Sequence, residues 1–311
     1  MSGFAAPALS TIPLTFAHVS DLHLPHEPQL TWAQRFSKRQ LSAWSWRKRR
    51  AVQRPEILEA LRADIGARAP DHVVVTGDIT NFALPEEFSK AGLWLAALAG
   101  EGGLSLVPGN HDALMPLDAA AGIGRWQAFT GGGEWPYVVR RRGVSFIGVC
   151  SALPTAPLLA SGRIGAAQLQ KLETLLRAEG ESGQTRVLLL HHPLVDGAVS
   201  ARKALRDRAA LRSVLASAGA ELVLHGHARA ARLEAVPGPH APVPVLCVPS
   251  SSALPNPRDE AARWHLVSIP GPGAPEPWAR VQVRQWSLAA AGFVDAAVYE
   301  LRLPDRAGGR T

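Results

Sequence analysis

The chain has 311 residues, of which 47% are hydrophobic, and this is enough to build one large core. The formal net charge of +7 favours a polyanionic partner, either nucleic acid, anionic lipid or a phosphorylated substrate. Two cysteines, Cys150 and Cys247, exclude a disulfide framework, and we expect both to be buried free thiols in a reducing compartment. No run approaches the roughly 18 apolar residues of a membrane span, and the N-terminus lacks a basic signal-peptide region, so we expect a cytoplasmic protein.

The first predicted strand, residues 14–19, ends in Ser20-Asp21-Leu22-His23. Residues two apart in an extended segment point to the same side, so Asp21 and His23 can converge on one ion. The carboxyl end of a strand is where open α/β sheets usually hold ligands. Taken alone, the pair equally fits a capping aspartate beside a hydrogen-bonded core histidine.

Residues 29–50 form a basic insertion that carries Trp32, Phe36, Trp44 and Trp46. The segment 35–54 is rich in arginine and lysine and contains no acidic residue. A surface helix of this composition suits an anionic membrane interface. It equally fits a cap over an active site, a surface that stacks on nucleic-acid bases, or a solvated helix whose aromatic residues dock on the domain.

Downstream of the insertion, predicted strands alternate with predicted amphipathic helices. The predicted strands are 72–76, 104–107, 137–142, 144–149, 187–190, 221–224, 243–248, 265–269, 278–286 and 293–303. The predicted helices are 55–69, 86–99, 165–179 and 203–218. This alternation indicates stacked sheets with helices outside. We predict a single domain over residues 12–303 and a disordered tail over 304–311.

Polar clusters follow five of these strands. Their candidate functional residues are Asp21, His23, Asp78, Asn110, His111, His191 and His227, and all except His111 are plausible metal ligands. Carboxylate, carboxamide and imidazole together suit Mn, Fe, Zn, Co or Ni better than Ca or Mg, and the absence of cysteine speaks against a structural zinc site. A carboxylate shared between two ions suits a pair about 3.5–4 Å apart that clamps a phosphoryl oxygen.

In order and spacing, these clusters resemble the motifs of the calcineurin-like metallophosphoesterases. The matching blocks are Asp21-x-His23, Gly77-Asp78, Gly109-Asn110-His111-Asp112, His191 and Gly226-His227, and the resemblance covers roughly residues 14–250. It implies an α/β fold, a four-layer αββα sandwich of two mixed β-sheets flanked by helices, with a dinuclear metal centre.

The resemblance also implies a role for each residue. Asp21, His23 and Asp78 would bind the first metal, Asp78 would bridge, and Asn110, His191 and His227 would bind the second. His111 would stabilise phosphoryl charge and protonate the leaving oxygen, oriented by Asp112. Hydrolysis would proceed by in-line attack of metal-activated hydroxide, without a covalent enzyme intermediate.

The last block departs from the family pattern. The family has Gly-His-x-His, whereas this chain has Gly226-His227-Ala228-Arg229. A guanidinium has no lone pair to offer a metal. The first metal then keeps Asp21, His23 and Asp78 and fills its vacancy with water, or the protein works with one metal and Arg229 as a phosphate-binding cation. The alternative is a catalytically weak phosphate-binding or membrane-surface module.

The resemblance implies a phosphoric ester hydrolase with one or two divalent ions (Mn, Fe, Zn or Co) per chain. The expected substrates are small phosphodiesters or pyrophosphates, such as a cyclic nucleotide or a nucleotide-linked lipid, within the bacterial phosphodiesterase or sugar-nucleotide-lipid pyrophosphatase branch. The insertion 29–50 favours an anionic membrane surface as partner, which would place the protein peripherally at the inner face of the membrane. The sequence indicates no specific protein partner.

Overall fold

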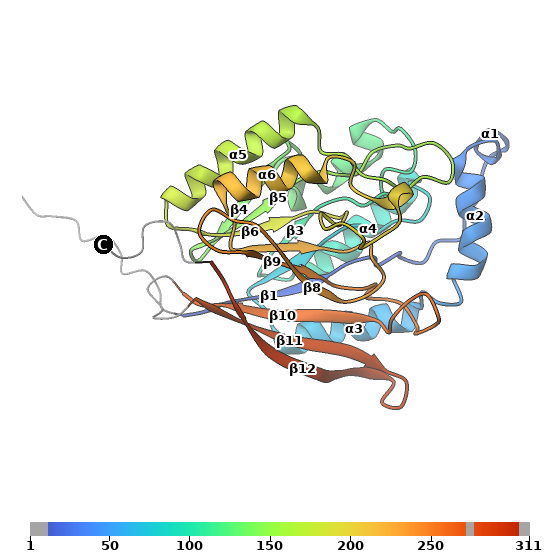
Figure 1. The fold of residues 1–311 in the computed structure, drawn as a ribbon. Coiled ribbons are helices and arrows are strands. Elements are labelled where there is room, and N and C mark those ends of the chain that lie inside the picture. Colours follow the sequence, from blue (N-terminus) through green and yellow to red (C-terminus); the bar gives the residue numbers. More distant parts are fainter. Residues whose placement is uncertain (1–11, 272–276, 305–311) are drawn as a thin grey trace, which may run out of the picture.

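A computed structural model describes residues 12–271 and 277–304, which form two six-stranded mixed sheets (Figure 1). The first sheet has the order β12-β11-β10-β1-β2-β3. Strands β1, β2 and β3 are parallel, whereas β10, β11 and β12 join antiparallel. Its strands are β1 (Leu14–Val19), β2 (His72–Val75), β3 (Leu104–Leu106), β10 (Arg263–Ile269), β11 (Trp278–Ser287) and β12 (Gly292–Arg302).

The second sheet has the order β4-β5-β6-β7-β9-β8. Its inner strands β5, β6, β7 and β9 are parallel, and the edge strands β4 and β8 are antiparallel to their neighbours. The strands are β4 (Tyr137–Arg141), β5 (Val144–Gly148), β6 (Thr185–Leu189), β7 (Leu222–His225), β8 (Arg232–Val236) and β9 (Val243–Cys247).

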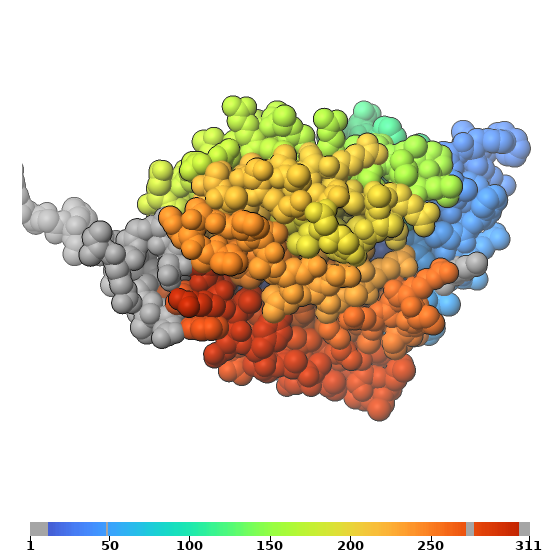
Figure 2. Space-filling view, in the orientation of Figure 1, coloured from blue at the N-terminus to red at the C-terminus, as the bar shows by residue number. Residues whose placement is uncertain are grey.

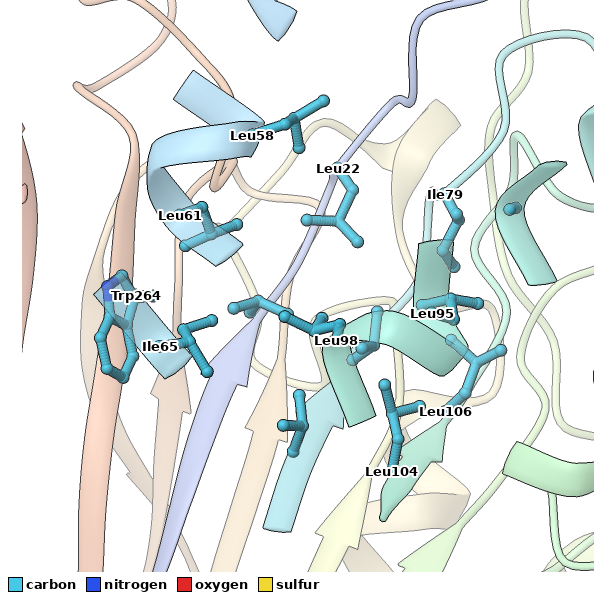
Figure 3. Packing of buried hydrophobic residues seen from close by; sticks show 14 of the residues in the cluster. Leu22, Leu58, Leu61, Ile65, Ile79, Leu95, Leu98, Leu104, Leu106 and Trp264 are labelled. Atoms are coloured by element: carbon cyan, nitrogen blue, oxygen red, sulfur yellow. The ribbon is translucent and has the colours of Figure 1, made fainter. Parts of the chain in front are cut away.

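Helices cover the outer face of each sheet, which confirms the predicted four-layer sandwich (Figure 1). Helices α3 (Pro55–Arg68) and α4 (Pro85–Ala99) pack on the first sheet, and α5 (Ala166–Glu181) and α6 (Arg208–Ala218) pack on the second. Figure 3 shows Leu58, Leu61 and Ile65 of α3 facing the strands together with Leu95 and Leu98 of α4. Burial of these apolar side chains is what fixes the helices on the sheets.

A third apolar cluster fills the space between the two sheets. Phe16 of β1 meets Phe146 of β5 edge to face, with ring centroids 5.3 Å apart. The cluster extends from Leu14 to Leu303, which supports the single domain that we propose over residues 12–303. Of the expected disordered tail, residues 305–311 lie outside the described residues.

Several local expectations differ from the structure. The helix expected over 203–218 begins only at Arg208, after the 3-10 turn η3 (Ala201–Lys203). The chain between them is not helical because the side chain of Leu205 packs in the core. The sequence analysis missed β8, an edge strand whose residues alternate between partly exposed and exposed. Cys247 is buried as expected, whereas Cys150 is only partly buried; both are free thiols.

The stretch 113–135, in which the sequence predicts no helix or strand, contains the two short 3-10 helices η1 (Ala119–Ala121) and η2 (Ile123–Phe129). The insertion 29–50 forms two helices, α1 (Trp32–Arg35) and α2 (Lys38–Arg49). The chain turns between them at Ser37, whose hydroxyl caps α2 by accepting from the amide of Arg39. No helix among the described residues is long and apolar enough to cross a membrane.

Candidate metal centre

The predicted site residues follow the carboxyl ends of parallel strands in both sheets. In the first sheet, Asp21 and His23 come directly after β1, Asp78 after β2, and Asn110 with His111 after β3. In the second sheet, His191 comes after β6 and His227 after β7. The two sheets pack face to face, so these strand ends meet at one edge of the sandwich and bring together residues that are up to about two hundred positions apart.

The backbone at these residues is unusual. Asp21, His23, Asp78, His227 and Arg229 have φ angles of 50°, 44°, 54°, 65° and 61°, in the left-handed region. Such conformations cost non-glycine residues roughly 1–3 kcal/mol each and persist where the surrounding structure imposes them. Here the loop after β1 is bonded to the loop after β2, because the amides of Asp21 and His23 donate to the carbonyls of Gly77 and Asp78 at 2.9 and 3.0 Å.

Asp78 lies between two groups of metal-binding side chains. One group is His23, Asp78 and His111, and the other is Asp78, His191 and His227; within each group the ligand atoms lie within 4.8 Å of one another. Asp78 Oδ2 is 3.9 Å from His23 Nε2 and 3.5 Å from His191 Nε2. His191 Nε2 in turn lies 3.1 Å from His227 Nδ1.

Asp21 stands beside these groups. Its Oδ2 accepts hydrogen bonds from the Ser20 hydroxyl at 2.7 Å and the His227 amide at 3.0 Å. Burial, with the neighbouring Asp78 carboxylate, raises the pKa of the Asp21 carboxyl above its ordinary value. Although burial alone would raise the pKa of Asp78 as well, the adjacent His191 and His111 hold it well below that value. A cation between the two carboxylates would stabilise the charged form of both.

Unpartnered polar atoms also fit a metal centre. His23 Nδ1, Asn110 Oδ1 and His227 Nε2 are buried and lack a hydrogen-bond partner among the described residues. Leaving such an atom unpaired costs roughly 1–3 kcal/mol. Burial also lowers the pKa of His23 and His227 well below the ordinary value, which favours the neutral imidazole that binds metals. Imidazole nitrogen, carboxamide oxygen and carboxylate form a donor set that suits divalent transition metals.

The Thr76 carbonyl orients the His191 ring. Although burial alone would lower the pKa of His191, the carboxylates of Asp78 and Asp21 raise that pKa to about 9. His191 Nδ1 lies 2.6 Å from the carbonyl oxygen of Thr76, to which only a protonated nitrogen can donate. In the neutral ring, Nε2 then carries the lone pair and faces Asp78 and His227. Such a backbone contact on the remote nitrogen is the usual way in which a ligating histidine is oriented.

Asp112 and His111 differ from the expectation that Asp112 orients His111. The Asp112 carboxylate accepts hydrogen bonds from the backbone amides of Ile79, Thr80 and Gly109 and from the Thr80 hydroxyl, so it fixes the loops after β2 and β3. The His111 ring instead contacts the Asn81 carbonyl through Nδ1 at 3.1 Å. The His111 amide donates to Asp78 Oδ1 at 2.8 Å, which ties the two residues together.

Arg229 lies at the rim of the centre. Its Nη1 is 3.4 Å from Asp259 Oδ1, and the side chain is 38% exposed. Its positive charge reaches the buried cluster, because it is one of the charges that lower the pKa of His23, after burial and the charge of His111.

Helix α2 contributes a residue that the sequence analysis did not single out. Arg49 Nη1 lies 2.9 Å from His111 Nε2. Arg39 and Ser42, on the same face of α2, donate to the carbonyls of Phe82, Ala83 and Asn81. The helical spacing of Arg39, Ser42, Trp46 and Arg49 was the available signal, but the surrounding run of arginines hid it.

Comparisons with known proteins give a family and structures of the same fold. The calcineurin-like phosphoesterase family model matches residues 14–228. A dimetal phosphatase from Danio rerio is similar in structure, with a TM-score of 0.60 and 13% identity, covering 93% of this chain and 98% of that one. Purple acid phosphatase PPD1 from yellow lupin (Lupinus luteus) seeds gives a TM-score of 0.57 and 11% identity, covering 94% of this chain and 54% of that one. No curated protein matches the sequence.

Proposed function

The chain belongs to the calcineurin-like phosphoesterases, and from this membership we propose that it hydrolyses a phosphodiester or pyrophosphate bond at the cluster centred on Asp78. It is a metallophosphoesterase with a buried His/Asp metal-ligand cluster. The observation that carries the proposal is the position of Asp78 Oδ2, 3.9 Å from His23 Nε2 and 3.5 Å from His191 Nε2. One carboxylate can thus serve two ions.

We assign the ligands as follows. The first ion would be held by Asp21, His23 and Asp78, and the second by Asp78, Asn110, His191 and His227. Divalent ions at these positions, of which Mn, Fe, Zn or Co suit the donor set, supply Lewis acidity toward a phosphoryl oxygen and lower the pKa of water. Arg229 offers no lone pair, so in this proposal the first ion keeps three protein ligands.

His111 holds its proton away from the cluster. Arg49 has only donors, so His111 Nε2 must accept, and Nδ1 carries the proton toward the Asn81 carbonyl. Burial lowers the pKa of His111 to about 4, so the ring is neutral before substrate arrives. A bound phosphoryl anion favours the imidazolium. We propose that Nε2 then leaves Arg49, takes up a proton from solvent and delivers it to the leaving oxygen.

The two other proposed residues act at the edges of the site. Asp112 accepts from the amides of Ile79, Thr80 and Gly109 and so fixes the loops after β2 and β3. Asp78 and His111 lie on these two loops and are positioned in this way. Arg229 can release Asp259 and contribute its guanidinium to an anionic substrate, because the present contact of 3.4 Å is long for a charge-assisted hydrogen bond.

Hydrolysis of bis-p-nitrophenyl phosphate by Mn-reconstituted protein tests this function. We expect turnover in the wild type and its loss in Asp78→Asn and Asn110→Ala, with unchanged circular dichroism. The loss of turnover should exceed about 100-fold, because mutating even a residue that hydrogen-bonds to a metal ligand lowers activity by up to that factor. Asp118→Asn, which alters an exposed carboxylate, is the matched control. Retained turnover in the two site variants would contradict the proposal.

A second role, contact with an anionic membrane surface, is favoured by one observation on the insertion. Trp32 and Phe36 are 74% and 78% exposed and meet edge to face at 5.0 Å, and Trp44 of α2 is 58% exposed. Exposed aromatic side chains beside basic residues suit the lipid headgroup region. We propose that the protein works in the cytoplasm, peripherally at the inner face of the membrane, on a nucleotide-linked lipid or a similar phosphoric ester.

A further inference from the structure

Arg49 of α2 is a partly buried cation without an acidic partner within 4.0 Å among the described residues. Its Nη1 contacts His111 Nε2 at 2.9 Å, its Nη2 lies 3.3 Å from the Ser42 hydroxyl, and its Nε is buried without a hydrogen-bond partner. Among the residues that the structure describes, no carboxylate lies within 4.0 Å of its guanidinium. The positive charge therefore stands beside the metal cluster uncompensated at close range.

Two buried arginines of this chain have an acidic partner, whereas a third, Arg39, donates to backbone carbonyls instead. Arg186 pairs with Glu221 at 2.6 Å, and Arg284 pairs with Asp64 at 2.5 Å. A buried guanidinium is costly unless an anion and further hydrogen bonds compensate it. Burial lowers the pKa of Arg49 to about 10, so it stays charged near neutral pH. A bound anion would supply the close partner that Arg49 lacks among the described residues.

The insertion holds Arg49 in place before any ligand arrives. On one side, Lys38 Nζ donates to the Thr155 hydroxyl at 2.6 Å and the Leu159 carbonyl at 2.9 Å, in the segment that follows β5 of the second sheet. On the other side, Arg39 and Ser42 bind the carbonyls after β2 of the first sheet. Helix α2 thus contacts loops that follow strands of both sheets. Figure 2 shows the blue segment at one end of the molecule. Such preorganisation reduces the entropy lost on binding.

We propose that Arg49 is a substrate-binding residue whose guanidinium donates to a non-bridging phosphoryl oxygen of the phosphoric ester. This inference rests on the proposed function. In the substrate-free protein Nη1 contacts His111 Nε2, so the same guanidinium positions the imidazole before the phosphoryl group arrives. The fork of donors in a guanidinium matches the spacing of phosphoryl oxygens. The insertion 29–50 then serves the active site directly, in addition to any role at a membrane.

The test compares Mn-reconstituted wild type, Arg49→Ala, Arg49→Gln and Arg49→Lys. Arg47→Met is the matched control, because Arg47 is exposed on the same helix two residues away. Two readouts are needed, namely kcat and KM for bis-p-nitrophenyl phosphate, and calorimetric binding of inorganic phosphate. For Arg49→Ala we expect phosphate binding and kcat/KM to fall about 10- to 100-fold, the equivalent of one lost charge-assisted hydrogen bond.

Arg49→Gln keeps two donors but no charge and should lose nearly as much, whereas Arg49→Lys should recover part of the affinity. Added guanidine should restore part of the rate in Arg49→Ala. The manganese content of the Arg49 variants should match that of the wild type. The control Arg47→Met should match the wild type in kcat, KM and phosphate binding. Wild-type phosphate affinity in both Arg49→Ala and Arg49→Gln would overturn the proposal, and if the alanine variant does not fold, the glutamine variant decides. Phosphate binding does not require turnover, so an inactive wild type would defeat the proposed function without deciding the role of Arg49.

Discussion

The carboxylate of Asp78 lies 3.5 Å from the imidazole of His191, although Asp78 follows a strand of one sheet and His191 follows a strand of the other. The centre is therefore assembled only when the two sheets pack against each other. The apolar cluster between the sheets, which includes Phe16 and Phe146, holds this arrangement. A change that loosens the packing between the two sheets should therefore also disturb the metal centre.

Replacing Arg229 by histidine should strengthen the binding of the first ion. The resemblance implies a histidine at this position, and Arg229→His would offer a nitrogen lone pair at the rim of the centre, where the charge of Arg229 acts on His23. We expect the first ion to bind about 10- to 100-fold more tightly, by the order that single residues around a metal change affinity. Manganese retained after dialysis, measured by mass spectrometry, checks this expectation. Equal retention in the variant and the wild type would show that Arg229 does not limit the first ion.

Gly109 allows two loops to approach closely beside the cluster. A Cβ at this position would lie 2.8 Å from Cγ of Asp78 and would overlap its Oδ1. Gly109→Ala should therefore displace Asp78, lower the free energy of unfolding by about 1–3 kcal/mol and weaken manganese binding.

Gly66→Ala is the control for this substitution, because a Cβ there meets nothing within 4 Å inside helix α3. It should raise stability by roughly 0.5–1 kcal/mol, since alanine loses less backbone entropy than glycine in a helix. Urea unfolding of both variants gives the comparison. Unchanged stability and unchanged metal binding in Gly109→Ala would contradict the close approach.

His72 should make stability depend on pH. Its ring stacks on Phe146 at 4.6 Å, Nδ1 faces the Gly102 carbonyl and Nε2 faces the Ser105 hydroxyl. Burial, with the charge of Arg141, lowers the pKa of His72 to about 4. The unfolded chain therefore binds the proton first, and the contribution of His72 to stability is present above about pH 6.5 and is lost as the pH falls toward 4.

His72→Gln tests this dependence without changing the metal cluster. In the wild type, the free energy of unfolding should drop between about pH 7.5 and about pH 5, and roughly 2 kcal/mol of that drop belongs to His72. The variant should be less stable at the higher pH and should lose correspondingly less on acidification. Denaturant titrations at the two pH values provide the measurement. The same drop in both proteins would exclude His72 as the source.

The exposed aromatic residues of the insertion should determine binding to anionic vesicles. Trp32→Ser with Phe36→Ser removes the edge-to-face pair, and each aromatic side chain contributes about 1.5–3 kcal/mol when it leaves water. Flotation with phosphatidylglycerol vesicles should show more than about tenfold weaker binding, while hydrolysis of a soluble ester is retained. Leu93→Ser, which removes an exposed side chain of α4, is the control. If the double variant floats with the vesicles as well as the wild type does, this surface is excluded as the membrane contact.

Much of the fold can be predicted from the sequence because the inner strands are short apolar runs that end in polar clusters. The run His72-Val-Val-Val75 before Gly77-Asp78 is an example of a strand whose burial and end can both be predicted. Strand β8 has no such signal, since an edge strand with partly exposed positions resembles a loop. Arg49 could not be assigned either, because only packing of α2 on the loop after β2 distinguishes it from the neighbouring arginines.

The link between bound metal and turnover tests the central claim most directly. Manganese content by mass spectrometry and the rate of bis-p-nitrophenyl phosphate hydrolysis would be measured together, on protein stripped with a chelator and then titrated with manganese. We predict that the stripped protein is inactive and that the rate rises with bound manganese up to one or two ions per chain. Full activity of the stripped protein, or stoichiometric manganese binding without hydrolysis, would contradict the account.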